Sequence, residues 1–347
     1  MTKGTVLVTG GVGYIGSHTT VELLQQNYEV IIVDNLSTSQ KEILEGIKKI
    51  TGKKPVFYKV DLKNYNEVKN LLKKHKIDSI IHFAAYKAVG ESVEKPLKYY
   101  ENNILSLINT LKIAEEYKIN NFIFSSSCTV YGQPKKLPVT EKTPVIKPNS
   151  PYGNTKKIAE EILQDTTEPN KNLNVVSLRY FNPIGAHPSH LIGELPIGVP
   201  NNLVPFITQT AYGIRPQLKV FGNDYSTPDG TPIRDYIDII DLAEAHIKAL
   251  EYLTTSKNKK NFEVFNIGAG KGYSVLEIIK TFEQVTGQKL NYTFAPRRPG
   301  DIEQIWADAT KANTVLKWKT KRTPAHSLKT AWEWEKHYRT QIVKKSI

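Results

Sequence analysis

The sequence predicts an α/β fold: a doubly wound parallel sheet with helices on both faces, followed by a smaller, loop-rich α/β part. Two observations lead to this prediction. Strand-like apolar runs alternate with helix-like segments through the first half of the 347 residues, which is the βαβ rhythm of a parallel sheet. After residue 182 the chain becomes rich in Pro, Gly and Asn, which is typical of a binding region built from loops.

A glycine-rich turn stands near the start of the chain. A β-branched run precedes it and helix-spaced residues follow, so Gly10, Gly13 and Gly16 occupy a strand-to-helix turn. Such a turn brings backbone N–H groups and a helix N-terminus to a pyrophosphate. The next strand-like run ends at Asp34, 18 residues after Gly16, where a carboxylate reaches the adenosine ribose and would repel a 2′-phosphate. This combination predicts a Rossmann-type site for NAD.

The remaining elements follow from apolar periodicity. Residues 235–267 have regular patterns again and are expected to return to the main sheet. The NAD-binding part, residues 1–182, and the substrate-binding part, residues 183–347, are therefore expected to interleave. From about Arg339 the chain has the composition of a frayed basic tail. Strands are predicted at 54–60, 79–85, 121–127, 174–181 and 262–267, with helices at 64–75, 97–117, 203–212, 274–286 and 311–315.

The formal net charge of +13 at pH 7 allows either nucleic-acid binding or a lysine-rich solvated surface. The lysines are scattered singly and in pairs, which favours the solvated surface and predicts no nucleic-acid partner. No apolar run approaches the ~20 residues that span a bilayer, so no membrane association is expected. The single cysteine, Cys128, fits a reducing cytoplasm and is expected to be a small core residue.

Candidate catalytic residues follow the strand at 121–127, because ligands of such sheets bind beyond the carboxyl ends of the strands. The spacing Tyr-x-x-x-Lys occurs three times, but only Tyr152 and Lys156 follow a strand that ends in serines and stand on a cleanly capped helix. A free tyrosine has a pKa of ~10. The ammonium of Lys156 and a positive nicotinamide ring both favour the phenolate, so Tyr152 is predicted to act as the base. Ser127 is predicted to hydrogen-bond the reacting oxygen.

With these residues in place, the chain resembles the extended short-chain dehydrogenase/reductase family, and within it the enzymes that epimerise UDP-hexoses at C4. The likeness runs from the glycine turn to Asp308, over nearly the whole chain. The motifs that carry it are residues 10–18, 33–36, 82–92, 125–132, 150–153 and 179–186.

The resemblance implies a tightly bound NAD that is regenerated in each turnover. It assigns the pyrophosphate to Gly10, Gly13, Tyr14, Ile15 and Gly16, and the adenosine part to Asp34, Asn35, Ser39, Asp61 and Leu62. It assigns the rest of the cofactor to Phe83, Ala84, Ala85, Lys87, Asn102, Ser125, Tyr152, Lys156 and Tyr180. The implied UDP-sugar ligands are Ser127, Tyr152, Phe181, Asn182, Asn201, Asn202, Leu203, Phe221, Arg234, Tyr236, Arg298, Asp301 and Ile305.

The implied activity is interconversion of UDP-glucose and UDP-galactose through a 4-keto sugar, with Tyr152 as base, Lys156 tuning it and Ser127 at the 4-oxygen. The resemblance also implies a homodimer that pairs the helices starting near Leu97 and Tyr152. No metal is needed for this chemistry, and the eight histidines show no metal-ligand spacing.

Three alternatives remain open in the sequence. The resemblance places Ile305 beside the sugar's 2-substituent, where an aromatic residue resembles the strict glucose/galactose form and a small one admits N-acetylhexosamines. Isoleucine is intermediate in size between an aromatic and a small residue, so a UDP-N-acetylglucosamine or dual-specificity 4-epimerase is the first alternative. Dehydratases of the family carry an Asp-Glu pair where this chain has Cys128-Thr129, which argues against elimination. A non-catalytic NAD- or nucleic-acid-binding module is disfavoured by the joint presence of Ser127, Tyr152 and Lys156.

Overall fold

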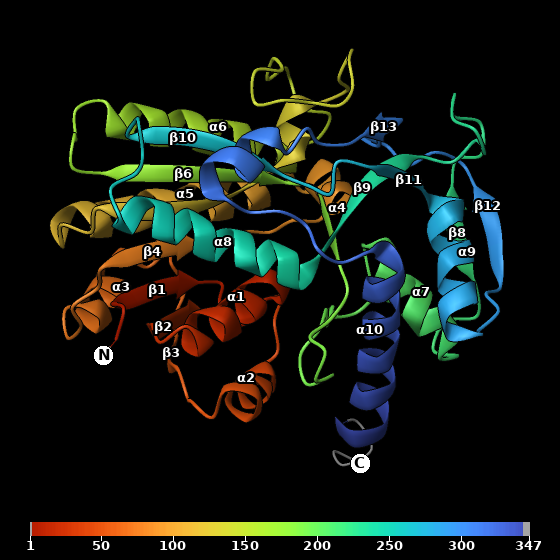
Figure 1. The fold of residues 1–347 in the computed structure, drawn as a ribbon, viewed down its shortest axis with the longest axis horizontal. Coiled ribbons are helices and arrows are strands. Elements are labelled where there is room, and N and C mark those ends of the chain that lie inside the picture. The colour runs from red at the N-terminus through yellow and green to blue at the C-terminus, as the bar shows by residue number, and fades with distance from the viewer. Residues whose placement is uncertain (1, 343–347) are drawn as a thin grey trace.

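A parallel sheet forms the centre of the molecule. The structure, a computed structural model, describes residues 2–342, and within them seven strands follow the order β10-β6-β5-β4-β1-β2-β3 (Figure 1). The chain builds outward from β1 to β3, then crosses back and builds from β4 in the other direction. The strand order therefore reverses between β1 and β4, where ligands of doubly wound sheets bind. The strands are β1 (Thr5–Thr9), β2 (Glu29–Asp34), β3 (Val56–Lys59), β4 (Ser79–His82), β5 (Asn121–Ser127), β6 (Asn174–Tyr180) and β10 (Phe262–Ile267).

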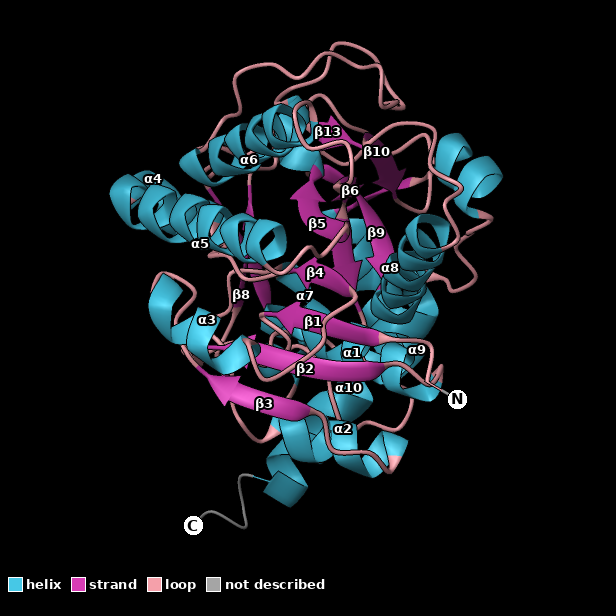
Figure 2. Ribbon diagram, turned by 90° about the vertical axis from the view of Figure 1, so that its left-hand side faces the viewer, coloured by secondary structure: helices cyan, strands magenta, loops and turns pink. Residues whose placement is uncertain are grey.

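Helices cover both faces of this sheet (Figure 2). Alternate side chains of each strand point to opposite faces, and the two cores follow that alternation: Val6 and Val8 pack in one, Leu7 in the other. The first core is covered by α1 (Tyr14–Gln25), α2 (Ile43–Thr51) and α8 (Ile239–Thr254), the second by α3 (Tyr65–Leu72), α5 (Pro96–Glu116) and α6 (Pro151–Thr167). The short α4 (Val89–Glu94) packs against α5 and α6.

A second, smaller part lies beside the large sheet, at the right of Figure 1. Within the described residues, β9 stands at the centre of four strands and pairs with β7, β11 and β13. A third core gathers under these strands and includes Phe282 and Trp332. The elements are β7 (Asn182–Ile184), α7 (Leu203–Ala211), β8 (Leu218–Phe221), β9 (Ile233–Asp238), β11 (Gly272–Ser274), α9 (Val275–Thr286), β12 (Tyr292–Ala295), β13 (Gln304–Ile305) and α10 (Pro324–His337).

The predicted fold class is confirmed, and the strands at 121–127 and 262–267 have the predicted bounds. Of the stretch 235–267, β10 joins the large sheet and α8 packs on it, whereas β9 belongs to the smaller sheet. The strand predicted at 79–85 stops at His82, because the chain then turns across Gly10.

Other expectations about single elements were wrong. The helices α2 and α10 were not predicted, and the helix expected at 311–315 is a π-helical turn, Ala312–Leu316. The expected tail from Arg339 continues as a helical turn to Ile342, and its last five residues lie outside the described range. No helix in the described range is long and apolar enough to cross a membrane.

Candidate active site

The glycine turn between β1 and α1 has the shape of an anion cradle. Gly10 has φ +68°, and a Cβ there would lie 2.8 Å from the backbone nitrogen of Ala84. A Cβ on Gly16 would overlap the carbonyl of Gly10, whereas one on Gly13 would meet only that carbonyl, at 3.2 Å. Gly13 is the N-cap of α1 and gives no side-chain cap, and no acid stands in the first turn. The first N–H groups of α1 therefore face an open side, which fits a pyrophosphate.

Asp34 closes β2 beside this turn. Its Oδ1 accepts hydrogen bonds from the backbone of Leu36 at 2.8 Å and the hydroxyl of Ser39 at 2.9 Å. Its Oδ2 accepts only one, from the backbone of Val12 at 3.1 Å. A carboxylate has about four acceptor positions, so Oδ2 retains one for a ribose hydroxyl. Farther along, the adenosine candidate Asn35 donates to Asp61 at 3.2 Å.

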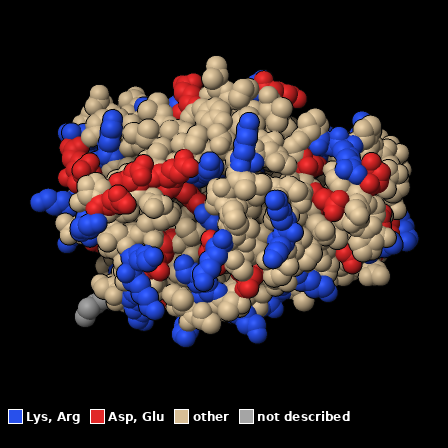
Figure 3. All heavy atoms as spheres, turned by 90° about the horizontal axis from the view of Figure 1, so that it is seen from above, with Lys and Arg blue, Asp and Glu red and all other residues tan. Residues whose placement is uncertain are grey.

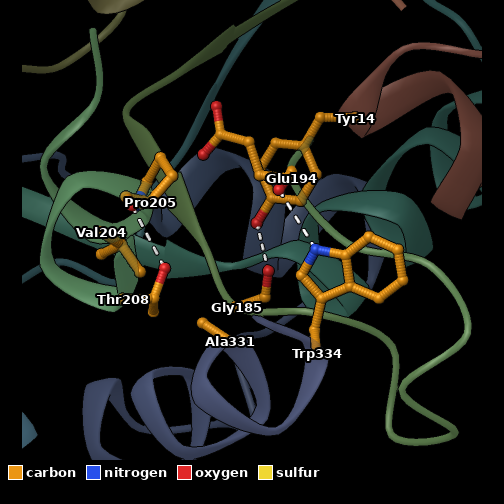
Figure 4. A pocket seen from close by; sticks show the side chains of 8 residues that line it. All are labelled: Tyr14, Gly185, Glu194, Val204, Pro205, Thr208, Ala331 and Trp334. Carbon is orange, nitrogen blue, oxygen red and sulfur yellow. Dashed lines mark hydrogen bonds between the residues drawn. The ribbon is translucent and has the colours of Figure 1, made fainter. Parts of the chain in front are cut away.

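Tyr14 lies where the two parts of the molecule meet, with Gly185, Glu194 and Trp334 around it (Figure 4). The Tyr14 hydroxyl donates to the carbonyl of Gly185 at 2.6 Å. Glu194, which sequence reasoning missed, accepts from Lys87 at 2.9 Å and from Asn202 at 2.6 Å. Its backbone carbonyl also accepts from the indole of Trp334 at 3.2 Å. A cofactor candidate and a substrate candidate thus share one carboxylate, which no local spacing in the sequence indicates.

The helix α6 brings Tyr152 and Lys156 to the end of β5. Ser150 caps it by accepting from the backbone of Gly153 at 3.2 Å, as the sequence predicted. The Lys156 ammonium donates to the backbone carbonyl of Ser125 at 2.6 Å and lies 6.0 Å from the centroid of the Tyr152 ring. Both side chains are thereby directed to the serine end of the strand.

Ser127 ends β5 with its hydroxyl beside Tyr152. The hydroxyl oxygen accepts from the backbone of Thr129 at 3.2 Å and from its hydroxyl at 3.0 Å. Two accepted bonds leave the Ser127 O–H free to donate to an oxygen beside Tyr152.

Burial dominates the titration of this group. It raises the pKa of Tyr152 to about 12, against the lowering effect of the Ser127 hydroxyl. Burial also lowers the pKa of Lys156 to about 7, with Glu160 opposing the shift. In the chain without its cofactor, burial thus favours the neutral phenol of Tyr152, and the joint effect expected of Lys156 and a positive nicotinamide ring stays a prediction.

The remaining cofactor candidates line the same edge. Tyr180 and Ser125 hydrogen-bond through their hydroxyls. The rings of Phe83 and Tyr180 both contact His246 of α8, with centroids 4.7 and 5.8 Å apart. Asn102 lies buried on α5 and donates to Asn103 at 3.0 Å. The other cofactor candidates are Ile15 in the first turn of α1, Leu62 after β3, and Ala84 and Ala85 after β4.

The substrate candidates gather on the smaller sheet. Strand register puts Asn182 of β7 opposite Tyr236 of β9, and Arg234 of β9 opposite Ile305 of β13. Ile305 is buried with Phe181 in a small core next to the end of β5. Cys128 belongs to the same core, and burial raises its pKa to about 12, as expected for a structural thiol.

Two arginines and an acid stand beside this sheet. Arg298 bridges Asp301 at 3.0 Å and stacks its guanidinium 4.9 Å from the Phe221 ring centroid. Arg234 lies 3.8 Å from Asp301 but also donates to the carbonyl of Ile302 at 2.7 Å, so part of it holds the backbone. The candidates Asn201, Asn202 and Leu203 stand at the start of α7, where Asn202 is the N-cap.

The surface shows no single block of positive charge on the face drawn in Figure 3, where basic and acidic side chains are interspersed. On that face the positive charges are scattered rather than clustered, which is typical of a solvated, lysine-rich surface.

The chain has extensive similarity to known proteins. The family model described as GDP-mannose 4,6 dehydratase matches residues 7–330. A UDP-glucose 4-epimerase of Yersinia enterocolitica is 49% identical over 331 residues, which cover 95% of this chain and 97% of that protein. One from Drosophila melanogaster is 49% identical over 341 residues, covering 96% and 97%.

A solved structure agrees in fold along nearly the whole chain. It is a UDP-glucose 4-epimerase from Bifidobacterium longum in complex with NAD+ and UDP, and it superposes with a TM-score of 0.94 at 44% identity. The match covers 96% of this chain and 99% of that one.

Proposed function

The chain belongs to the family that the GDP-mannose 4,6 dehydratase model describes and is an NAD-dependent UDP-hexose 4-epimerase, and we propose that Tyr152, Lys156 and Ser127 carry its chemistry. The observation that supports these roles most is the shared anchor on β5. Lys156 is fixed by the Ser125 carbonyl at 2.6 Å, two residues before a serine whose hydroxyl proton is free to donate.

The cofactor residues that we propose follow from the shape of the cradle. Gly10, Gly13 and the first turn of α1 hold the pyrophosphate, and the remaining lone pair of Asp34 holds the adenosine ribose. Bound NAD supplies the hydride acceptor at the sugar's C4 and returns the hydride in the second half of the reaction.

Tyr152 takes the proton of the 4-hydroxyl and later gives it back, while Ser127 donates a hydrogen bond to the same oxygen as it becomes a carbonyl. Lys156, positively charged, stabilises the phenolate that this requires. Burial raises the pKa of Tyr152 to about 12 in the chain itself, and the positive ring of bound oxidised NAD would add to the stabilisation of the phenolate.

The UDP moiety is held while the 4-keto sugar presents its other face. We assign this to the pair Arg234 and Arg298, since guanidinium groups give charge-assisted hydrogen bonds to a diphosphate. The sheet register that joins Tyr236 to Asn182, and Arg234 to Ile305, supports a single UDP-sugar site across β7, β9 and β13. The division into an NAD-binding part, 1–182, and a UDP-sugar part, 183–347, belongs to the same proposal.

The substrates that we propose are UDP-glucose and UDP-galactose. Ile305 is 1% exposed and packs with Phe181 and Cys128, so it closes the wall beside the end of β5. UDP-N-acetylhexosamines are the second candidate, because isoleucine leaves more room at that wall than an aromatic side chain would.

We further propose a homodimer in the cytoplasm. Leu97 and Leu105 of α5 are 80% and 37% exposed. Apolar side chains on an exposed helix face are suited to pairing with a second subunit. The lone buried cysteine is typical of a reducing compartment.

One experiment tests the activity and the bound cofactor together. The purified protein is denatured and its supernatant assayed for NAD(H), and the native protein is given UDP-galactose without added cofactor. Formation of UDP-glucose with about one NAD(H) released per chain is the expected result. Turnover that occurs only with added NAD contradicts a tightly bound cofactor. The absence of any turnover contradicts the activity itself.

A further inference from the structure

A buried ion pair lies directly behind the proposed catalytic residues. Glu160 stands one helical turn after Lys156 on α6, and Arg179 stands next to Tyr180 on β6. The Arg179 guanidinium donates to both carboxylate oxygens of Glu160, at 2.9 and 3.2 Å from Nε and 2.5 Å from Nη2. Both side chains are only 7% exposed.

The middle serine of the run at the end of β5 belongs to this pair rather than to the site. Because side chains alternate along a strand, Ser126 faces away from Ser125 and Ser127. Its hydroxyl donates to Glu160 at 2.6 Å, and that of Ser177 on β6 donates at 2.8 Å. The carboxylate of Glu160 thus joins α6 to both strands.

The guanidinium extends the network to the edge strand β10, where Asn266 is the register partner of Arg179. Arg179 donates to the Tyr131 hydroxyl at 3.0 Å, which donates to Asn266 of β10 at 2.7 Å. Burial opposes the charge of Arg179, but its hydrogen bonds to Glu160 still raise its pKa above the ordinary value. Arg179 is therefore a fixed cation that compensates a fixed anion.

We propose that Arg179 and Glu160 are positioning residues that set the charge beside Lys156 and hold α6 in register with the end of β5. The proposal rests on the roles proposed above for Tyr152 and Lys156. Neither residue contacts the reacting atoms: Glu160 acts through Lys156, and Arg179 acts through Glu160.

The direction of each effect follows from the sign of the charge. Glu160 favours the charged form of Lys156, and Arg179 weakens that influence by neutralising the carboxylate. His82 of β4 adds no opposing charge, because burial and the Lys156 ammonium lower its pKa to about 3 and leave it neutral. The elements packed against α6 carry these titratable groups: Glu91 and Glu94 of α4, Lys98, Tyr99, Tyr100, Glu101, Lys112, Glu115 and Glu116 of α5, Cys128 and Tyr131 after β5, Arg179 and Tyr180 of β6, and Glu263 of β10.

The test is the pH profile of turnover in NAD-loaded enzyme. Removing one negative charge in Glu160→Gln is expected to move the profile by about one unit to lower pH, the size of a single close charge effect. Removing one positive charge in Arg179→Gln is expected to move it to higher pH. The double variant, which loses both charges, is expected to return near the parent profile, and Arg179→Lys to remain there.

A merely structural pair would behave differently. Both single variants would then lower the melting temperature and turnover without shifting the profile in opposite directions, and that result overturns the proposal. If Arg179→Gln does not fold, the pH profile of Glu160→Gln is compared with that of the double variant. Equal profiles overturn the proposal, and a profile shifted to lower pH in Glu160→Gln alone supports it.

Two controls separate this outcome from others. Arg322 makes a similar bond to the buried Asp241 of α8, so Arg322→Gln is expected to cost stability and leave the profile unmoved. If Tyr152→Phe keeps full turnover, the proposed catalytic roles fail. If Tyr152→Phe loses turnover but the Glu160 and Arg179 variants shift nothing, only the positioning proposal fails.

Discussion

The ammonium of Lys156 hydrogen-bonds the backbone carbonyl of Ser125 at 2.6 Å, two residues before Ser127 on the same strand. The lysine is therefore located by main chain rather than by another side chain. Because Tyr152 precedes Lys156 by one turn of α6, the tyrosine and Ser127 are placed by the same contact. The arrangement of Tyr152, Lys156 and Ser127 therefore depends on how α6 packs against the end of β5.

The first prediction concerns the Tyr152 hydroxyl. We expect Tyr152→Phe to lower kcat by about 10²–10⁴, the usual contribution of a positioned acid–base group. The ring stays buried, so the melting temperature and the amount of co-purifying NAD(H) are expected to remain near the parent values. Turnover is measured by conversion of UDP-galactose to UDP-glucose, with NAD(H) content and thermal unfolding as the controls. A parental kcat would remove Tyr152 from the mechanism.

The second prediction separates two glycines of one turn. Gly13→Ala adds a methyl whose only close neighbour is the Gly10 carbonyl at 3.2 Å, so the variant is expected to fold and to bind NAD weakly. Gly16→Ala forces the methyl into that carbonyl and is expected to lower the melting temperature as well. Melting curves with and without NAD distinguish the two. Equal behaviour of both variants would show that the open side of Gly13 does not face the ligand. Gly90→Ala, at a helical position with nothing near its added methyl, is the matched control.

The third prediction is a pH dependence of stability. His18 of α1 is buried with its Nδ1 2.7 Å from the Tyr14 carbonyl, and burial lowers its pKa to about 3. The unfolded chain takes up a proton below its ordinary pKa of about 6.5 while the folded chain does not. Stability from this group is therefore present above about pH 6.5 and is lost as the pH falls toward 3.

Urea unfolding of the parent and of His18→Gln measures this loss. From about pH 7.5 to about pH 5, the parent is expected to lose about 2 kcal/mol more unfolding free energy than the variant. His326→Gln, at an exposed position, is expected to follow the parent. Parallel curves for parent and His18→Gln would mean that His18 takes up its proton equally in both states.

The fourth prediction concerns substrate range. Replacing the buried Ile305 by alanine opens the wall beside Phe181 and Cys128. A change of a few methyl groups in an apolar wall is worth about 10–200-fold in discrimination. We expect Ile305→Ala to raise the ratio of kcat/KM for UDP-N-acetylgalactosamine over UDP-galactose by at least about tenfold. Ile305→Leu, of similar volume, serves as the control, and an unchanged ratio in Ile305→Ala would place the 2-substituent elsewhere.

The sequence predicted best where a local pattern carries the geometry. The glycine turn, the end of β2 at Asp34 and the cap of α6 at Ser150 are set by residues close in the chain, so spacing was sufficient. The serine run showed where β5 ends, but not that Ser126 would face Glu160 instead of the site. Strand alternation, applied to the run, could have indicated this.

Long-range contacts were beyond what spacing can give. Glu194 joins Lys87 to Asn202 across 107 residues on one side, and nothing near it in sequence marks it. The membership of β9 in the smaller sheet depended on its partners β7, β11 and β13, which are two or three residues long and leave almost no periodic signal. The burial that raises the pKa of Tyr152 was likewise not visible in the sequence, because the degree of burial is set by packing.

The edge strand β10 has a consequence for biosynthesis. It pairs with β6 along its whole length, yet residues 182–238 of the smaller sheet and α8 come between the two strands in the chain. A ribosome that has released only the first 182 residues has made a sheet whose β6 edge is bare. That edge is closed only once residue 267 has emerged, so the nascent chain must keep an unpaired strand from aggregating while residues 183–267 are made.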